Sequence, residues 1–511
     1  MKQWLKTKKG RLQALGILLV CLVVLSLILF NTLVEKIVKR YSLYTPLTAA
    51  ADYDVSDECF ALLDRVFQNE SASVTLLFLR EREDVDADKT ERYLLKTAES
   101  IAERYAQVQI SFCDPIENPE TLRPYTVVKD VRTGKVSLDE EGNPKTRTLP
   151  ENGLIILCGD YVRVYDLEEF FTFEGGDLSK VTAYGGESKL TAGILHAIKG
   201  EAPLACLTNN HGETFYDYEL LYLLDDAGYA VDYLDLSKEE IPANCRLVVT
   251  YNPNADFLDS DGVTASETDC LGDFLSQAGN HFLLFAGSAT PRLASLEQFL
   301  LRYGVEFAYS DASAEENVYR YSVKDDSATL TSDGYSIYGK AESELTMGVK
   351  DSVVFQNATA IRVASGFINR QNGRYEKGNM TLRTLYTASD RAAAFASGRQ
   401  VGAGAFQLAT LTEITLDGGS SSVAVIASTD FCEERFLQSA VYGNRDALLR
   451  LCKGFGAGEN PEGLTIKPFS SDRMSLVTTR QKFLWTAVLV ALPILLCGAF
   501  ALVVLVRRRN R

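Results

Sequence analysis

A histidine and a glutamate flank a glycine in the tripeptide His211-Gly212-Glu213, and the whole chain contains only three histidines. An imidazole beside a carboxylate is a pair that general acid–base catalysis and nucleophile activation use. The tripeptide follows an apolar run, 203–208, and precedes a helical pattern, so it lies at the carboxyl end of a predicted strand. Doubly wound α/β sheets bind ligands at this edge, near the N-termini of helices.

A structural turn accounts for the same residues. Glycine permits a tight bend, and Glu213 in the first turn of a helix complements the helix dipole. His211 can hydrogen-bond to the loop around it. We therefore favour a structural turn, and contact with a ligand or partner through Asn210, His211, Gly212 and Glu213 is the functional alternative. We expect none of the four to be catalytic.

The chain lacks the other groups that catalysis at this turn needs. It contains no G-x-S-x-G nucleophile elbow, and Cys158 and Cys206 lie inside strand-like runs, where a thiol behaves as a small buried hydrophobe. His196, on the polar side of its predicted helix, and His281, at the start of a strand, fit structural roles. No phosphate loop and no C-x-x-C pair occur, and the acidic stretch 252–262 lacks the acids of an EF-hand. We expect no cofactor and no metal.

Strand and helix patterns alternate in the first part of the chain, which predicts an α/β domain. Apolar runs predict the strands, 3.6-residue periodicity predicts the helices, and Gly200 ends the last helix. The expected elements are, in order, a strand at 74–79, a helix at 91–106, a strand at 108–112, a hairpin or loop at 129–150, a strand at 154–158 and a helix at 187–198.

The second part resumes the alternation at residue 203 and predicts a doubly wound sheet. Phe215, Tyr218, Leu221 and Tyr222 give its first helix an apolar stripe. Short alternating runs rich in Ser, Thr, Tyr and Asp predict β-rich insertions at 310–400. The other expected elements are strands at 203–208, 246–251, 281–286 and 422–428, a helix headed by Ser266 with capping-box spacing to Asp269, a helix at 293–303 stopped by Gly304, and a last helix at 443–455.

Two long apolar segments, 12–34 and 483–506, stand apart from the rest of the chain. A helix needs about 20 apolar residues to cross a bilayer, so both segments predict transmembrane helices. Basic residues at 1–11 and 507–511 predict that both termini are cytoplasmic. The expected localisation is therefore a two-span cell-membrane protein with its bulk extracytoplasmic. The formal net charge of −16 argues against binding of nucleic acid.

The order of several short motifs resembles the auxiliary components of ABC-2-type transport systems, the family that includes the gliding-motility (GldG-like) protein. "NHGE" (210–213) is similar to the family's GHGE turn, with Asn210 in place of the first glycine. The other motifs that carry the resemblance are "ISFCDPIENPE" (110–120), "NGLIILCGDYVRVYDLEEFF" (152–171), "GESKLTAGILHAI" (186–198), "VAVIASTDFCEERF" (423–436) and "YGNRDALLRLCKGF" (442–455).

This resemblance implies a non-enzymatic auxiliary subunit that works with a separate ABC permease and a separate cytoplasmic ATPase, presenting cargo or coupling it to them. We expect a thioredoxin-like α/β domain at 35–200, without the redox C-x-x-C, and a flavodoxin- or amidotransferase-like domain at 201–470, without the nucleophile. The alternatives are a cell-surface hydrolase of glycan or peptide that uses His211 and Glu213, and an envelope scaffold protein.

Overall fold

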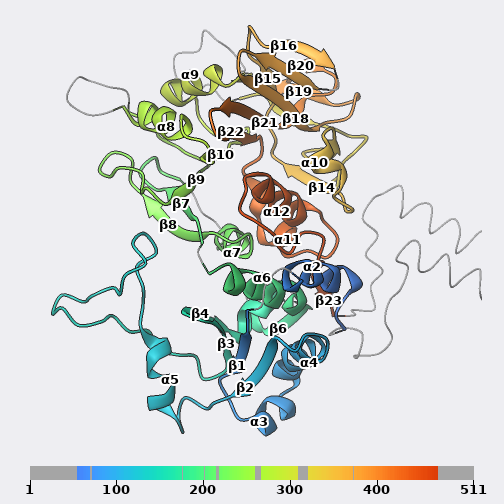
Figure 1. The fold of residues 1–511 in the computed structure, drawn as a ribbon. Helices are drawn as coiled ribbons and strands as arrows, with labels where there is room; N and C mark the ends of the chain where they lie inside the picture. The colour runs from blue at the N-terminus through green and yellow to red at the C-terminus, as the bar shows by residue number, and fades with distance from the viewer. Residues whose placement is uncertain are drawn as a thin grey trace, which may run out of the picture. The chain divides into compact units, whose positions relative to one another are not determined.

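The computed structural model describes residues 54–68, 72–174, 177–200, 202–213, 218–258, 266–308, 320–371 and 373–469 (Figure 1). These residues form mixed α/β structure with several sheets. By its internal contacts the described part of the chain belongs to a single unit. The boundary expected near residue 200 stays a prediction.

The first sheet has four strands in the order β2-β1-β3-β4. Strands β1 and β2 are parallel, and β3 runs antiparallel to both β1 and β4. These strands span Val74–Phe78 (β1), Val108–Phe112 (β2), Gly153–Cys158 (β3) and Tyr161–Asp166 (β4), and a smaller sheet contains Phe171–Glu174 (β5), Asp177–Tyr184 (β6) and Lys467–Pro468 (β23).

Helix α4 connects β1 to β2 and shows why the local pattern gives a helix. The side chain of Asp88 caps it by accepting hydrogen bonds from the backbone N–H groups of Thr90 and Glu91. One face of α4 is apolar and buried, at the helical spacing of Leu94, Leu95, Ala98 and Ile101. The helices of this part are α2 (Asp57–Phe67), α3 (Arg82–Ala87), α4 (Lys89–Arg104), α5 (Pro119–Thr126), the 3₁₀-helix η3 (Leu167–Phe170) and α6 (Gly186–Lys199).

Helix α6 is buried along most of its length, from Gly186 to Ala197. It packs against the first sheet and against helices α2, α4 and α7. Gly193 permits a close approach to the first sheet, because a Cβ there would lie 2.4 Å from Cδ1 of Ile156. This helix therefore joins the core of the first sheet to the elements that follow.

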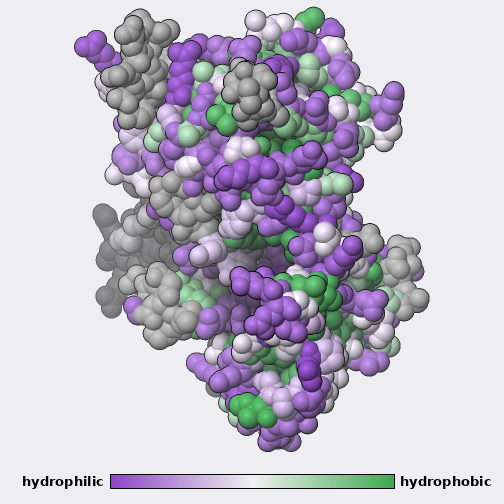
Figure 2. Space-filling model, turned by 90° about the vertical axis from the view of Figure 1, so that its left-hand side faces the viewer, coloured by the Kyte–Doolittle hydropathy of each residue, from purple (hydrophilic) through white to green (hydrophobic). Residues whose placement is uncertain are grey.

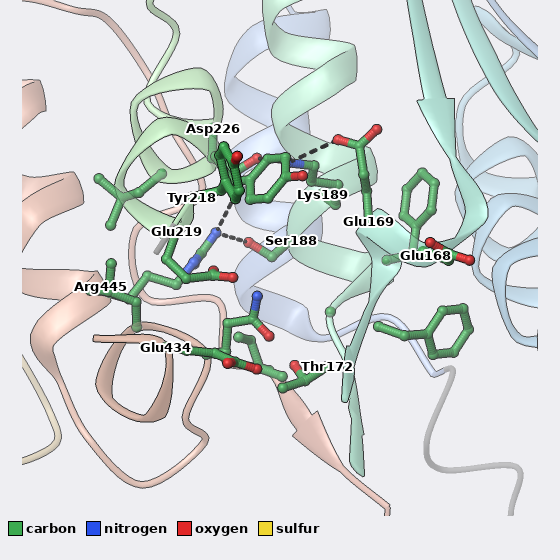
Figure 3. Close-up of a pocket in the computed structure, with 18 of the residues that line it drawn as sticks. Glu168, Glu169, Thr172, Ser188, Lys189, Tyr218, Glu219, Asp226, Glu434 and Arg445 are labelled. Atoms are coloured by element: carbon green, nitrogen blue, oxygen red, sulfur yellow. Dashed lines mark hydrogen bonds and ion pairs between the residues drawn. The ribbon is translucent and has the colours of Figure 1, made fainter. Parts of the chain in front are cut away.

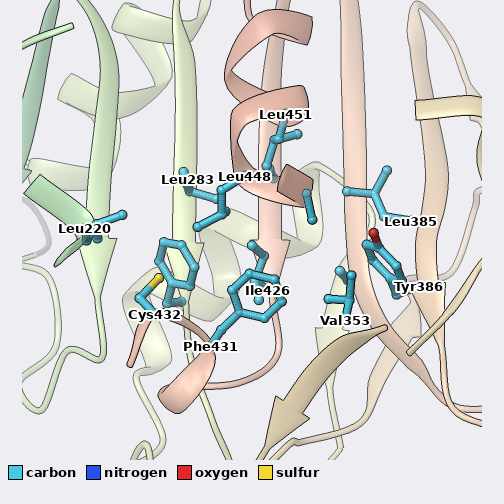
Figure 4. Close-up of a cluster of buried hydrophobic side chains, with 14 of the residues drawn as sticks. Leu220, Leu283, Val353, Leu385, Tyr386, Ile426, Phe431, Cys432, Leu448 and Leu451 are labelled. Carbon is cyan, nitrogen blue, oxygen red and sulfur yellow. The ribbon is translucent and has the colours of Figure 1, made fainter. Parts of the chain in front are cut away.

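The second sheet has thirteen strands, and its parallel part runs in the order β8-β7-β9-β10-β22. Helices α7 and α12 pack on one face of this part and α8 and α9 on the other, and each face has its own apolar core. Figure 4 shows part of the first of these cores. The elements are β7 (Leu204–Thr208), α7 (Glu219–Asp226), β8 (Ala230–Leu234), β9 (Cys245–Tyr251), α8 (Glu267–Leu275), β10 (His281–Phe285), α9 (Ala294–Arg302), β22 (Gly419–Ile426), the 3₁₀-helix η4 (Asp430–Cys432), α11 (Glu434–Leu437) and α12 (Asn444–Gly454).

Short, mostly antiparallel strands fill the chain between α9 and β22. Eight of them belong to the second sheet: β14, β13, β18 and β21 continue it beyond β22, and β11, β15, β16 and β17 pair at its side. Their bounds are β11 (Val305–Phe307), β12 (Ser322–Lys324), β13 (Ser336–Ala341), β14 (Val353–Gln356), β15 (Ile361–Val363), β16 (Ile368–Gln371), β17 (Arg374–Lys377), β18 (Met380–Thr387), β19 (Ala393–Ala396), β20 (Arg399–Ala403) and β21 (Gln407–Leu416), and the helix α10 spans Glu344–Met347.

The polar stretch expected as a hairpin or loop is a long hairpin-like extension, closed by antiparallel bridges between Val127 and Thr146 and between Lys129 and Val136. Arg132, near its tip, forms ion pairs with Asp232 of β8 and with Glu239, the latter at 2.5 Å. These contacts attach the extension to the edge of the second sheet.

The structure corrects the prediction of a two-span membrane protein in fold class and in localisation. Among the described residues no helix is both long enough and apolar enough to cross a membrane. The longest of them, α4, has 16 residues and carries charged side chains on its outer face. The two segments on which the prediction rested, 12–34 and 483–506, lie outside the described residues.

Candidate functional site

The His211 turn lies at the point of the second sheet where doubly wound folds bind ligands. The chain passes from β7 to its neighbour β8 on one side and then crosses to β9 on the other side. The loops that follow β7 and β9 therefore leave the sheet at a topological switch point, the usual ligand position in such sheets.

Backbone hydrogen bonds join these two loops to each other. The N–H groups of Asn254 and Ala255, after β9, both donate to the carbonyl of His211 at 2.8 Å. The side-chain amide of Asn254 donates to the carbonyl of Gly212 at 2.7 Å. Gly212 has a φ of 67°, which is the left-handed region that glycine adopts without strain. The turn is thus held against the loop after the neighbouring strand.

The imidazole of His211 is held between two carboxylates. Its Nδ1 lies 3.1 Å from Oε1 of Glu213, and its Nε2 lies 2.9 Å from Oε2 of Glu267, the first residue of α8. The ring stacks on Phe257, with the two ring centres 3.8 Å apart and the planes 8° from parallel. The side chains of His211, Glu213 and Glu267 are 2 %, 1 % and 0 % exposed. The imidazole is closed off on both edges and one face.

The two carboxylates are bound by further donors. Glu213 accepts from the hydroxyl of Thr208 at 2.5 Å and from the backbone N–H of His211 at 2.7 Å. Glu267 accepts from the backbone N–H of Leu258 at 2.6 Å and from the side-chain amide of Asn210 at 2.7 Å. We name His211, Glu213 and Glu267 the histidine clamp.

The electrostatics of the histidine clamp favour a charged imidazole. Burial lowers the pKa of His211, but its hydrogen bonds to Glu213 and Glu267 outweigh burial and raise the pKa to about 9. Burial raises the pKa of each glutamate, but the hydrogen bond to His211 and the other donors bring it below its ordinary value. At neutral pH the imidazole therefore carries a proton on each nitrogen, and it has no lone pair with which to act as a general base.

The sequence pattern found part of this cluster. It grouped Asn210, His211, Gly212 and Glu213, and the structure brings all four together at the predicted turn. It missed Glu267, which is 56 residues from His211, because an acidic residue in the first turn of a helix is an ordinary dipole partner. Contact of these four residues with a ligand or partner stays a prediction.

The remaining histidines have structural surroundings. His196 was expected on the polar side of its helix, but that expectation is wrong: α6 is covered on all sides, His196 is buried, and burial lowers its pKa. His281 is buried in β10, where it stacks on Phe455 and Nδ1 contacts the hydroxyl of Ser422 at 2.6 Å. Burial lowers the pKa of His281 to about 4, so its imidazole is neutral.

A cavity of about 460 Å³ lies away from the histidine clamp. Figure 3 shows Glu168, Glu169 and Thr172 on one side of it and Tyr218, Glu219 and Arg445 on the other, with Ser188 and Lys189 of α6 between them. The lining comes from η3, β5, α6, α7, α11 and α12. Its residues are Asp166, Glu168, Glu169, Phe170, Phe171, Thr172, Phe173, Gly185, Ser188, Lys189, Tyr218, Glu219, Tyr222, Leu223, Asp226, Glu434, Leu437, Gln438, Arg445 and Ile466.

Two cations, the buried Lys189 and the partly buried Arg445, meet on Asp226 inside this cavity. Nζ of Lys189 lies 3.0 Å from Oδ1 of Asp226, and the guanidinium of Arg445 lies 2.9 Å from its Oδ2. Arg445 also donates to the hydroxyl of Ser188 at 2.9 Å, and Lys189 lies 3.8 Å from Glu169. The pairs connect α6, α7 and α12, so they fix the wall of the cavity.

Of the apolar stripe expected on α7, only Leu221 packs partly against the core, Tyr218 and Tyr222 are 73 % and 42 % exposed, and Phe215 lies outside the described residues. The buried apolar residues of α7 are Leu220, Leu223 and Leu224. Helix α7 turns its leucines toward the second sheet and leaves the tyrosines beside the cavity. Hydrophilic side chains cover much of the face in Figure 2, and hydrophobic side chains are scattered among them.

No protein-family model matches this sequence, and no curated protein matches it either.

Proposed function

We propose that this chain is a non-enzymatic accessory subunit of an ABC-2-type transport system, which acts by binding a separate permease and a separate ATPase. The observation that carries the non-enzymatic part is the histidine clamp. At the switch point of the sheet, where an enzyme of this architecture would hold its substrate, the imidazole is buried and has both nitrogens bound to carboxylates.

The partners are inferred from the sequence. The chain contains no phosphate loop of its own, so a transport cycle needs an ATPase from another chain. The order of motifs from residue 110 to residue 455 resembles the auxiliary components that accompany such an ATPase and its permease. Fold likeness alone would not identify a cargo, because one architecture serves many functions.

The rival reading, a hydrolase that uses His211 and Glu213, requires a free base that reaches its substrate. Both side chains are at most 2 % exposed, and the imidazole is protonated at neutral pH. The double variant His211→Ala/Glu213→Ala separates the two readings. We expect a lower melting temperature, whereas loss of a measured glycan- or peptide-hydrolysing activity at unchanged melting temperature would establish the hydrolase.

The partner claim is tested by affinity purification of the full chain from detergent extracts of its native cells, after chemical cross-linking. We expect a multi-span permease and an ATPase with a phosphate loop to be recovered together. Recovery of neither protein, with the bait itself intact, would overturn the proposal. The genes beside this one provide an independent check, since such partners are expected to be encoded nearby.

A further inference from the structure

The cavity between α6 and α7 is acidic and aromatic at once. Six carboxylates and two cations line it, which leaves a net formal charge of −4. Five aromatic rings share the lining, those of Phe170, Phe171, Phe173, Tyr218 and Tyr222. The faces of aromatic rings attract cations, and so do carboxylates. A lining of this kind selects a positively charged ligand and repels an anion.

Lys189 shows that the site already holds a cation in this way. Its Nζ lies 5.2 Å from the ring centre of Tyr222 and 3.0 Å from Asp226. The Lys189 side chain is only 6 % exposed. Burial lowers its pKa, but Asp226, Asp225 and Glu169 outweigh burial and raise it, so Lys189 is charged. The inner part of the cavity is therefore an ammonium site that the chain fills itself.

The exposed side of the cavity offers the same groups, aromatic rings and a carboxylate, at a place that Lys189 does not fill. Tyr218 and Tyr222 are four residues apart, so they lie on one face of α7. Tyr218 is 73 % and Tyr222 is 42 % exposed, and the exposed carboxylate of Glu168 lines the opposite side. The volume of about 460 Å³ is within the range of binding pockets, about 300–1,000 Å³.

We propose that this cavity binds an arginine or lysine side chain presented by a basic segment of a partner protein. The cation lies between Tyr218 and Glu168, which line opposite sides of the cavity, and the segment covers the exposed rings of Tyr218 and Tyr222. A peptide is preferred to a small free amine because Tyr218 lines the cavity and is also 73 % exposed, so that its ring has surface left for a longer segment to cover. The site is separate from the histidine clamp and goes beyond the proposed function.

The test uses the full chain and a short fluorescein-labelled peptide in which arginine alternates with glycine and serine. A second peptide carries citrulline, which has nearly the shape of arginine but no charge, and spermidine and free arginine serve as competitors. Fluorescence anisotropy measures binding at low and at high salt. We expect the arginine peptide to bind, the citrulline peptide not to bind, and binding to weaken at high salt.

Two variants at the rim locate the site. Tyr218→Ala and Glu168→Gln change exposed side chains. We expect each variant to lower the affinity for the arginine peptide by about threefold to fivefold. The matched controls are Tyr233→Ala, on β8, and Glu140→Gln, in the hairpin extension, which replace exposed side chains away from the cavity. Both controls should bind as the wild type does.

Four results would overturn the proposal. Equal binding of the citrulline peptide would show that the positive charge is not recognised. Unchanged binding by both rim variants would show that the peptide binds outside this cavity. Spermidine binding as tight as the arginine peptide, with the same response to the rim variants, would assign the cavity to a small amine instead of a protein segment. Absence of binding by either peptide would refute the site altogether.

Discussion

Replacement of His211 by glutamine tests whether the histidine clamp is an ion-pair network. The variant keeps a polar side chain but removes the positive charge from between Glu213 and Glu267, which are 1 % and 0 % exposed. Two buried carboxylates then face each other without a counter-charge. Removal of one partner of a buried ion pair costs about 3–5 kcal/mol, so we expect a strongly destabilised protein at neutral pH.

The pH dependence gives a second estimate of the same free energy. The pKa of His211 is raised from 6.5 to about 9, which corresponds to about 3–4 kcal/mol at about 1.4 kcal/mol for each pKa unit. A raised pKa means that this stabilisation is complete below pH 6.5 and is lost as the pH rises through 9. The two glutamates have lowered pKa values, so their contribution is present above pH 4.5 and is lost as the pH falls through their folded pKa values.

The assay is thermal unfolding of the full chain and of His211→Gln from pH 5 to pH 10. We expect the wild type to melt roughly 5–10 °C above the variant near pH 6, and we expect this gap to shrink as the pH rises through 9. His281→Gln is the matched control, because His281 is also buried, in β10 of the second sheet, but has a pKa lowered to about 4. The contribution of a neutral histidine is present above pH 6.5 and is lost as the pH falls toward 4.

Two results would refute the reasoning. If the gap between the wild type and His211→Gln stayed constant from pH 6 to pH 10, the imidazole would not be charged in the folded state. If the variant melted with the wild type at pH 6, the carboxylates would not depend on His211 at all. Either result would reopen His211 as a candidate base.

Other polar contacts give further predictions about the free energy of unfolding, each checked by urea or thermal unfolding of the full chain. Arg320→Leu should cost about 3–5 kcal/mol of stability, because the fully buried guanidinium pairs with Glu297 at 2.8 Å. The double variant Arg320→Leu/Glu297→Leu should regain most of this loss, because no buried charge is then left unpaired. A double variant no more stable than the single one would contradict this. Asn444→Ala should cost about 1–3 kcal/mol because Val354 loses the acceptor of its backbone N–H, 2.9 Å away, and an unchanged melting temperature would exclude that role. Arg132→Ala breaks two partly exposed ion pairs, so we expect a loss of only about 1 kcal/mol in the free energy of unfolding. We also expect faster proteolysis of the hairpin extension, and an unchanged cleavage rate would show that other contacts hold the extension.

Local features of the fold could be predicted because they depend on residues close together in the chain. Ser266 caps α8 by accepting from the N–H of Asp269 at 3.1 Å, as the spacing indicated. Gly200 and Gly304 end their helices with φ values of 78° and 88°, which other residues adopt only with strain. The apolar run at 281–286 is the buried strand β10.

Which face of an element is buried was harder to predict. His196 was assigned to a polar face because hydropathy ranks it so, but α6 is covered on every side by the sheet and by other helices. Tyr218 and Tyr222 were assigned to the core of α7 because they are large and aromatic, yet the leucines of the same helix occupy the core. Periodicity identifies an amphipathic helix, but a ring with a polar tip is stable on either side. The prediction of two transmembrane helices rested on hydropathy too, and no helix of the described residues meets that requirement.

The sequence by itself determined where strands and helices alternate and which turn gathers His211 and Glu213, since these follow from propensity, capping and spacing within a few residues. Only the tertiary structure decided what that turn is. Strand order placed the turn against the loop after β9, and the head of α8 supplied Glu267 as the second carboxylate from 56 residues away. The two carboxylates then keep the imidazole charged against the effect of burial, because their hydrogen bonds raise its pKa and hold the proton that a catalyst would need to release.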